Sequence, residues 1–186
     1  MNKIAVIVET RKHKALNFVL QNVMSNIPNE WGLQIFHGFN NLQYINNILE
    51  NNLFLKSIKE KIILTPLNIE SITQEASSEI MLSENFWNSV EGETILYFEC
   101  DSMLCPNSEY KVSDFEHFDY IGGYWGNILY GLNEKYPKVM NGGVSIRKKQ
   151  FMLNIIKNEW EPYIKQGGNP CEDYFVSACV KNKPTT

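Results

Sequence analysis

The sequence predicts an α/β fold in which a mostly parallel, doubly wound sheet is flanked by helices. Short apolar runs typical of buried strands alternate with segments of helical periodicity over residues 3–98. This alternation favours right-handed crossovers between parallel strands. The 186-residue chain, 44% hydrophobic and 20% charged, is long enough for one domain with a sizeable core. We therefore expect residues 1–186 to form a single domain.

The first β-α-β unit has the clearest pattern. Residues 3–8 (KIAVIV) form a continuous apolar run, as expected of a parallel strand covered on both faces. Residues 15–27 place their aliphatic side chains on one helical stripe, and Pro28 follows as a stop signal. Residues 33–36 then predict a second strand.

The same alternation continues toward the middle of the chain. The aliphatic positions of residues 42–49 predict a second helix, and residues 61–64 predict a third strand. Residues 94–98 (TILYF) predict a buried central strand.

A third helix is expected between the last two of these strands. Ser71 and Gln74 have the spacing of a capping box, which predicts a helix that begins at Ser71 and carries Trp87.

The second half of the chain is less regular and is expected to face the substrate. Residues 124–142 are polar and aromatic without clear periodicity, and Trp125 lies among them between glycines. A flat ring there suits stacking on a sugar or a base, and core packing is an equal alternative. Short strands are expected at 119–123 and 143–146.

Two helices are expected near the C-terminus. The apolar positions within 151–160 suit one helical face, and Pro162 is expected to end that helix. Residues 172–180 predict a last helix after a glycine-containing loop.

Charge and motif content exclude several classes of protein. The net charge of −4 leaves no basic stripe, so nucleic acid is not expected as a partner. The chain has no GxGxxG, GxxxxGK[ST] or GxSxG pattern, which argues against a dinucleotide-binding enzyme, a P-loop NTPase and an α/β-hydrolase.

The cysteines and the N-terminal residues predict a cytoplasmic protein. The four cysteines form no CxxC pair, and a domain of this size needs no disulfide framework, so we expect reduced thiols. The apolar run after Met1 is too short for a secretory leader or a membrane span, so no transmembrane segment is expected.

The most informative feature is a pair of acids directly after the predicted central strand. Glu99 and Asp101 lie one residue apart, so on an extended chain their side chains point the same way. In an open α/β sheet the carboxyl ends of the strands are where ligands bind. Two carboxylates at such a point predict a site for a hard divalent cation, Mg or Mn, which would bridge a diphosphate. The alternative is a solvated turn.

A second acidic pair, Glu172 and Asp173, begins the last predicted helix. One of them is a candidate general base, or a carboxylate that orients an acceptor. Acids at a helix N-terminus are also stabilised by the helix dipole, so simple capping remains the alternative.

Two further groups are candidate ligand contacts. Thr10 and Arg11 follow the first strand, where Arg11 can pair with a phosphate and Thr10 can bond a base edge. Asn141 and Gly142 precede the strand expected at 143–146, where the amide can bond a sugar hydroxyl and the glycine permits close approach. An ordinary polar strand end and an ordinary turn are the respective alternatives.

The order of these motifs resembles that of GT-A-type glycosyltransferases that use nucleotide sugars. Residues 96–104 (LYFECDSML) look like the DxD strand of that superfamily, with Glu in place of the first Asp. Residues 141–146 (NGGVSI) look like its strand beside the donor sugar, and residues 172–175 (EDYF) look like its later acidic motif. Residues 8–11, 36–38, 101–105 and 120–122 further resemble a small subfamily of glycosyltransferases found in bacteria and large DNA viruses.

The resemblance implies a GT-A-like, Rossmann-like domain that transfers a sugar from a nucleotide sugar, a UDP-sugar, to a glycan, lipid or protein acceptor. It implies Asp101 and Glu99 at the metal, and Thr10, Arg11, Glu99, Asn141 and Gly142 at the nucleotide and donor sugar. It places Asp173, or Glu172, at the catalytic position.

One departure from the superfamily pattern leaves two explanations open. No histidine follows Asp173, although many such enzymes supply a late histidine ligand. Either the metal has fewer protein ligands, or the chain is one domain of a longer polypeptide. A nucleotidyltransferase and a non-catalytic carbohydrate- or nucleotide-binding module remain the alternatives to a glycosyltransferase.

Overall fold

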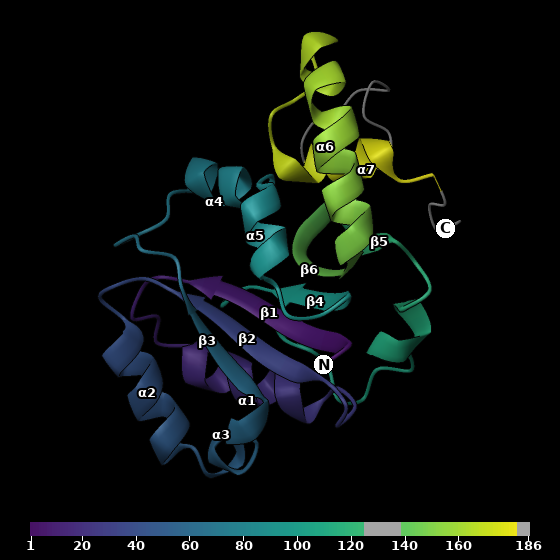
Figure 1. Cartoon of the computed structure of the whole chain (residues 1–186). Coiled ribbons are helices and arrows are strands. Elements are labelled where there is room, and N and C mark those ends of the chain that lie inside the picture. The colour runs from purple at the N-terminus through teal and green to yellow at the C-terminus, as the bar shows by residue number, and fades with distance from the viewer. Residues whose placement is uncertain (125–138, 182–186) are drawn as a thin grey trace.

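The computed structural model describes residues 1–124 and 139–181, which form a six-stranded mixed sheet with helices on both faces (Figure 1). The strand order is β3-β2-β1-β4-β6-β5. The strands are β1 (Lys3–Glu9), β2 (Gly32–His37), β3 (Ile62–Pro66), β4 (Thr94–Phe98), β5 (Tyr120–Tyr124) and β6 (Met140–Lys148).

Only β6 is reversed in this sheet, because β5 is antiparallel to β6 and therefore runs in the same direction as β4. Strands β3, β2, β1 and β4 pair in parallel, with Val6 opposite Gln34 on one side and Tyr97 on the other. Strand β6 runs antiparallel to both β4 and β5. The mostly parallel α/β sheet predicted from the sequence is confirmed.

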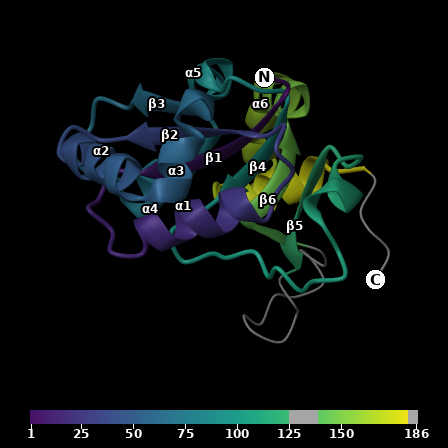
Figure 2. The ribbon, with the colours of Figure 1, turned by 90° about the horizontal axis from the view of Figure 1, so that it is seen from below.

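The described residues also form seven α-helices and two short 3₁₀ helices, of which α6 and α7 follow the last strand. They are α1 (Leu16–Ser25), α2 (Leu42–Asn51), α3 (Leu53–Ser57), η1 (Lys59–Lys61), α4 (Gln74–Met81), α5 (Glu84–Ser89), η2 (Val112–Phe115), α6 (Lys149–Lys165) and α7 (Glu172–Cys179). Figures 1 and 2 show α1, α2 and α3 on one face of the sheet, and Figure 1 shows α5 and α6 on the other.

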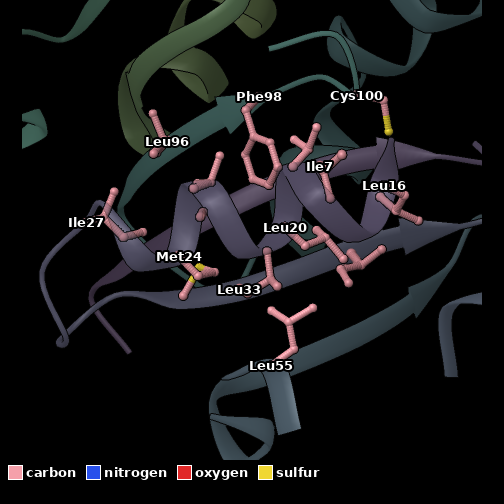
Figure 3. Close-up of a cluster of buried hydrophobic side chains, with 14 of the residues drawn as sticks. Ile7, Leu16, Leu20, Met24, Ile27, Leu33, Leu55, Leu96, Phe98 and Cys100 are labelled. Atoms are coloured by element: carbon pink, nitrogen blue, oxygen red, sulfur yellow. The ribbon is translucent and has the colours of Figure 1, made fainter. Parts of the chain in front are cut away.

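Each face of the sheet has its own hydrophobic cluster. On the α1 side, Leu16 and Leu20 pack with Ile7 of β1 and Phe98 of β4 (Figure 3). On the opposite side, Trp87 of α5 belongs to the second cluster, which the strand residues Ile4, Val6, Ile95 and Tyr97 share with α6 and α7. Alternate residues of β4 therefore serve opposite faces, as a strand buried on both sides requires.

Two helix boundaries differ from the sequence prediction. The segment expected to be one helix from Ser71 is two helices, α4 and α5, and the side chain of Thr73 caps the first by accepting from Ala76 N–H at 3.2 Å. Helix α6 continues through Pro162 to Lys165, because a proline in the last turn removes only one intrahelical donor.

Strand β6 is longer than the predicted 143–146. It begins at Met140, because Met140 and Asn141 pair with Tyr124 and Gly123 of β5. Asn141 and Gly142 therefore lie within a strand, and the prediction that they precede it is wrong.

No described helix is long and apolar enough to cross a membrane. The four cysteines form no disulfide within the described residues.

Candidate functional site

A pocket of about 490 Å³ lies where the carboxyl ends of β1 and β4 meet the beginning of β6 and of α7. This edge of the sheet is where ligands bind in open α/β folds. All eight residues selected from the sequence line this one pocket: Thr10, Arg11, Glu99, Asp101, Asn141, Gly142, Glu172 and Asp173. Residues near the start of α4, among them Thr73, Ser77 and Ser78, line it as well.

At the end of β1, Arg11 forms an ion pair with Glu9. Its Nε and Nη2 donate to the two carboxylate oxygens of Glu9, each at 2.9 Å, and its backbone N–H donates to Oε1 at 2.8 Å. Burial by itself raises the pKa of Glu9, but the hydrogen bonds from Arg11 outweigh it and hold that pKa below its usual value. The Arg11 side chain remains 66% exposed, so one face of a fixed cation is open to a ligand.

The loop after β1 is fixed by Asn41, which sequence reasoning missed. Its fully buried amide donates to the carbonyl oxygens of Glu9 at 2.7 Å and Arg11 at 3.2 Å, and its Oδ1 accepts from Gly38 N–H. Thr10 is 4% exposed, so it offers the pocket little surface. Asn41 thus holds the loop that carries Thr10 and Arg11 in place.

Beyond β4, Glu99 and Asp101 expose their side chains to the pocket. Within the described residues neither carboxylate has a hydrogen-bond or ion-pair partner. Enclosure by the pocket walls, and then the negative charge of Asp101, raise the pKa of Glu99. Two adjacent carboxylates without protein partners form a donor set that suits a hard cation.

Asn141, Gly142 and Gly143 of β6 border the pocket. The Oδ1 of Asn141 accepts from Gly143 N–H at 2.8 Å, so this oxygen is occupied within the strand. Gly142 is required by close approach: a Cβ there would lie 2.5 Å from Nη2 of Arg147 and 2.6 Å from Oδ1 of Asp173.

At the beginning of α7, the two acids have different surroundings. Glu172 is buried and forms an ion pair with Arg147, whose side chain is 1% exposed. Asp173 is partly exposed and accepts Gly142 N–H at 2.9 Å. Burial and the neighbouring Glu172 raise the pKa of Asp173 to about 8. Two residues of strand β6, distant in sequence, thus bind this pair: Arg147 binds Glu172, and Gly142 binds Asp173.

Arg147 was also missed by sequence reasoning. A single arginine after an apolar strand normally indicates a solvated strand end, and only the antiparallel pairing of β6 with β4 brings it into the interior. Burial by itself disfavours the charge of Arg147, but Glu172 outweighs this effect and raises the pKa of Arg147, so the guanidinium remains protonated.

The charges lining the pocket are predominantly negative. Five carboxylates line it against two guanidinium groups: Glu9, Glu99, Asp101, Glu172 and Asp173 against Arg11 and Arg147. Both guanidinium groups already form ion pairs with carboxylates of the pocket. The side chains of Glu99, Asp101 and Asp173 therefore remain as anions, or potential anions, without a cationic partner in the described residues.

Two other groups of polar side chains are weaker candidates for a functional site. Glu9, His13 and Cys100 bring ligand atoms within 4.8 Å of one another, but Arg11 binds both oxygens of Glu9. His37 is buried beside the Gly38 carbonyl and does not line the pocket. Trp125 lies outside the described residues.

The described strands and helices form a GT-A-like α/β fold, with the pocket at the carboxyl ends of β1 and β4. The chain belongs to the family described as "Protein of unknown function (DUF5672)", whose profile matches residues 41–186. No curated protein matches the chain.

Solved glycosyltransferases share the fold at low sequence identity. The glycosyltransferase GlyE of Streptococcus pneumoniae TIGR4 is 10% identical with a TM-score of 0.60, and the match covers 98% of this chain and 44% of GlyE. The galactosyltransferase LgtC, crystallised with donor and acceptor sugar analogues, is 14% identical with a TM-score of 0.62, covering 95% of this chain and 70% of LgtC. The chain thus spans less than half the length of GlyE, and this similarity concerns the fold.

Proposed function

We propose that the protein is a metal-dependent glycosyltransferase that moves a sugar from a nucleotide sugar, a UDP-sugar, to an acceptor hydroxyl. The observation that carries this proposal is the position of two acidic pairs in one pocket. Glu99 and Asp101 lie at the end of β4 without a partner among the described residues, and Glu172 and Asp173 lie at the beginning of α7. The glycosyltransferase fold of the domain supports the same reaction class.

The charge of the pocket fits a divalent cation. A nucleoside diphosphate is anionic, and Glu99 and Asp101, which neither guanidinium of the pocket pairs with, would repel it without a cation to offset their charge. Asp101 would hold Mn or Mg, and Glu99 would assist, because their oxygens are not engaged elsewhere in the described residues. The bound metal would stabilise the charge that develops on the departing diphosphate.

The remaining residues divide between donor and acceptor. The exposed face of Arg11 is positioned to bind the nucleotide portion, and the adjacent Thr10 contributes through its small exposed surface. Asn141 and Gly142 would border the donor sugar, where the Asn141 amide nitrogen is the group left to bind it. These assignments follow the position of each residue around the pocket.

Asp173, rather than Glu172, is proposed to receive the acceptor proton. Glu172 is buried against Arg147, whereas Asp173 is partly exposed to the pocket. As the acceptor oxygen forms a bond to the anomeric carbon and the diphosphate oxygen leaves with its electron pair, the hydroxyl proton passes to the Asp173 carboxylate. Because its pKa is about 8, Asp173 must first lose a proton, and we expect the rate to rise between pH 7 and pH 9.

A nucleotide-release assay tests this function. UDP-sugars and other nucleotide sugars are incubated with the protein, with and without Mn²⁺, and release of the nucleoside diphosphate is measured. We expect release with at least one UDP-sugar, only with the metal, and abolished in Asp101→Ala but not in Asp119→Ala, an exposed acid that does not line the pocket.

Other results would identify the alternatives. Binding of a nucleotide sugar without release would indicate a binding module. Release of pyrophosphate from a nucleoside triphosphate in the presence of a sugar phosphate would indicate a nucleotidyltransferase. Either result would contradict the proposed sugar transfer.

A further inference from the structure

Arg147 binds the acidic end of the pocket through three different nitrogens. Nη1 donates to Oε1 of Glu172, Nη2 donates to the carbonyl oxygen of Gly142 at 3.1 Å, and Nε donates to Oγ of Ser145 at 2.8 Å. The same Ser145 hydroxyl donates to the Gly142 carbonyl at 2.8 Å. The planar guanidinium therefore has a defined orientation, because its donors have a fixed geometry.

Three aromatic rings enclose this guanidinium. Its Cζ lies 5.0 Å from the ring centroid of Tyr97, 5.2 Å from that of Tyr120 and 5.8 Å from that of Trp87. All three side chains are buried, so water does not compete for the charge and the rings stabilise it through cation–π attraction. Burying a charge inside a core is costly unless it is paired, and the partner here is Glu172.

Gly142 connects the arginine to Asp173. Its carbonyl oxygen accepts from Arg147, and its N–H donates to Oδ1 of Asp173 at 2.9 Å. Fixing Arg147 consequently fixes both carboxyl groups, Glu172 directly and Asp173 through the strand backbone.

We propose that Arg147 is a positioning residue: it anchors Glu172 in the core and thereby holds Asp173 in the orientation in which it receives the acceptor proton. The proton transfer rests on the function proposed above, whereas the anchoring is a property of the free protein. Arg147 itself touches no reacting atom in this account.

Several charged or titratable groups act on Asp173. Glu172 and Cys171 adjoin it in the chain, Arg147 approaches from β6, Tyr97 from β4 and Tyr120 from β5. The pKa of Asp173 is raised by burial and by Glu172, and Arg147 opposes that increase. Both tyrosines have raised pKa values and remain neutral, so Arg147 and Glu172 are the charges to vary.

The test follows the titration of the Asp173 carboxyl carbon by ¹³C NMR in the free protein, without donor or metal. We expect Arg147→Gln to move the midpoint to higher pH by about one pH unit, and Glu172→Gln to move it to lower pH. The double variant R147Q/E172Q buries no unpaired carboxylate, and its midpoint should lie above that of E172Q alone. If R147Q by itself does not fold, the comparison of E172Q with R147Q/E172Q still shows whether Arg147 affects the Asp173 midpoint.

A merely structural arginine would give a different result. Its loss would lower the melting temperature while the Asp173 midpoint stayed the same in E172Q and in R147Q/E172Q, and that outcome would overturn the proposal. Where transfer activity is measurable, we also expect R147Q to lower kcat at least tenfold with the donor KM unchanged, because a positioned general base contributes about 10²–10⁴ in rate. A wild-type protein without transfer activity contradicts the proposed function only, because the NMR midpoints are measured without substrate.

Discussion

Gly142 donates its backbone N–H to Oδ1 of Asp173 at 2.9 Å and thereby joins strand β6 to the beginning of α7. Arg147 binds the carbonyl of the same glycine from the other side. The glycine thus lies between a buried cation and the proposed catalytic acid, where no side chain fits.

Replacing this glycine should damage the site. In Gly142→Ala the new methyl group would meet Arg147 and Asp173 at 2.5 and 2.6 Å, so one of them must move. We expect a loss of about 1–3 kcal/mol in the free energy of unfolding, measured by urea denaturation, because overpacking a filled site costs that much. Gly123→Ala is the matched control, since a Cβ at Gly123 meets no atom within 4 Å. Equal stability of the two variants would contradict the tight contact.

The protonation of Asp173 predicts how stability depends on pH. Its pKa is about 8 in the folded protein against about 3.9 in an unfolded chain, so the folded state retains a proton that the unfolded state has released. Stability contributed by this group is therefore complete below about pH 4 and is lost as pH rises toward 8. Asn cannot ionise, so the melting temperature of Asp173→Asn relative to wild type should increase from pH 5 to pH 8, with transfer activity lost. A melting-temperature difference that stays constant over this range would argue against the raised pKa.

The Glu9–Arg11 ion pair predicts a contribution to stability that is lost as pH falls, the reverse of the effect of Asp173. The pKa of Glu9 is lowered in the folded protein, so its stabilising contribution is present above the ordinary glutamate value of about 4.3 and is lost as pH falls through the lowered pKa. Arg11→Met leaves a carboxylate that is 3% exposed without its partner, and we expect a loss of about 1–3 kcal/mol at pH 7.

Chemical denaturation of Arg11→Met at two pH values checks this prediction. The loss should be smaller at pH 3.5, where Glu9 of the variant is protonated. Lys12→Met, at an exposed neighbouring position, should change stability little at either pH. If the two variants have the same stability at pH 7, the ion pair contributes nothing measurable.

Local sequence signals predicted most of the fold and the acidic residues of the site. The run 94–98 followed by Glu99 and Asp101 identified a strand end with carboxylates, because a buried strand and its polar end are both visible within ten residues. Arg147 was missed because its role depends on two pairings distant in sequence, β6 with β4 and Arg147 with Glu172. Asn41 was missed for the same reason, since the carbonyls that it binds belong to the loop after β1.

Two helix boundaries were also predicted at the wrong residues. Ser71 and Thr73 both have hydroxyl groups that can cap a helix, and both precede the same apolar positions. In the structure Thr73 is the N-cap of α4. Pro162 predicted a helix end because proline lacks a backbone N–H. The helix nevertheless ends one turn later, at Lys165, where the N–H of Gln166 donates to the Pro162 carbonyl.

Calorimetric titration with UDP measures whether a diphosphate binds at Glu99 and Asp101 through a metal ion. We expect UDP to bind the wild-type protein in the presence of Mn²⁺ and not in its absence, because without the metal Glu99 and Asp101 repel the diphosphate. Asp101→Ala should lose the metal-dependent binding while Asp119→Ala retains it. Binding of UDP that is equally strong with and without Mn²⁺, or that is unchanged in Asp101→Ala, would contradict a diphosphate anchored at this pair of carboxylates.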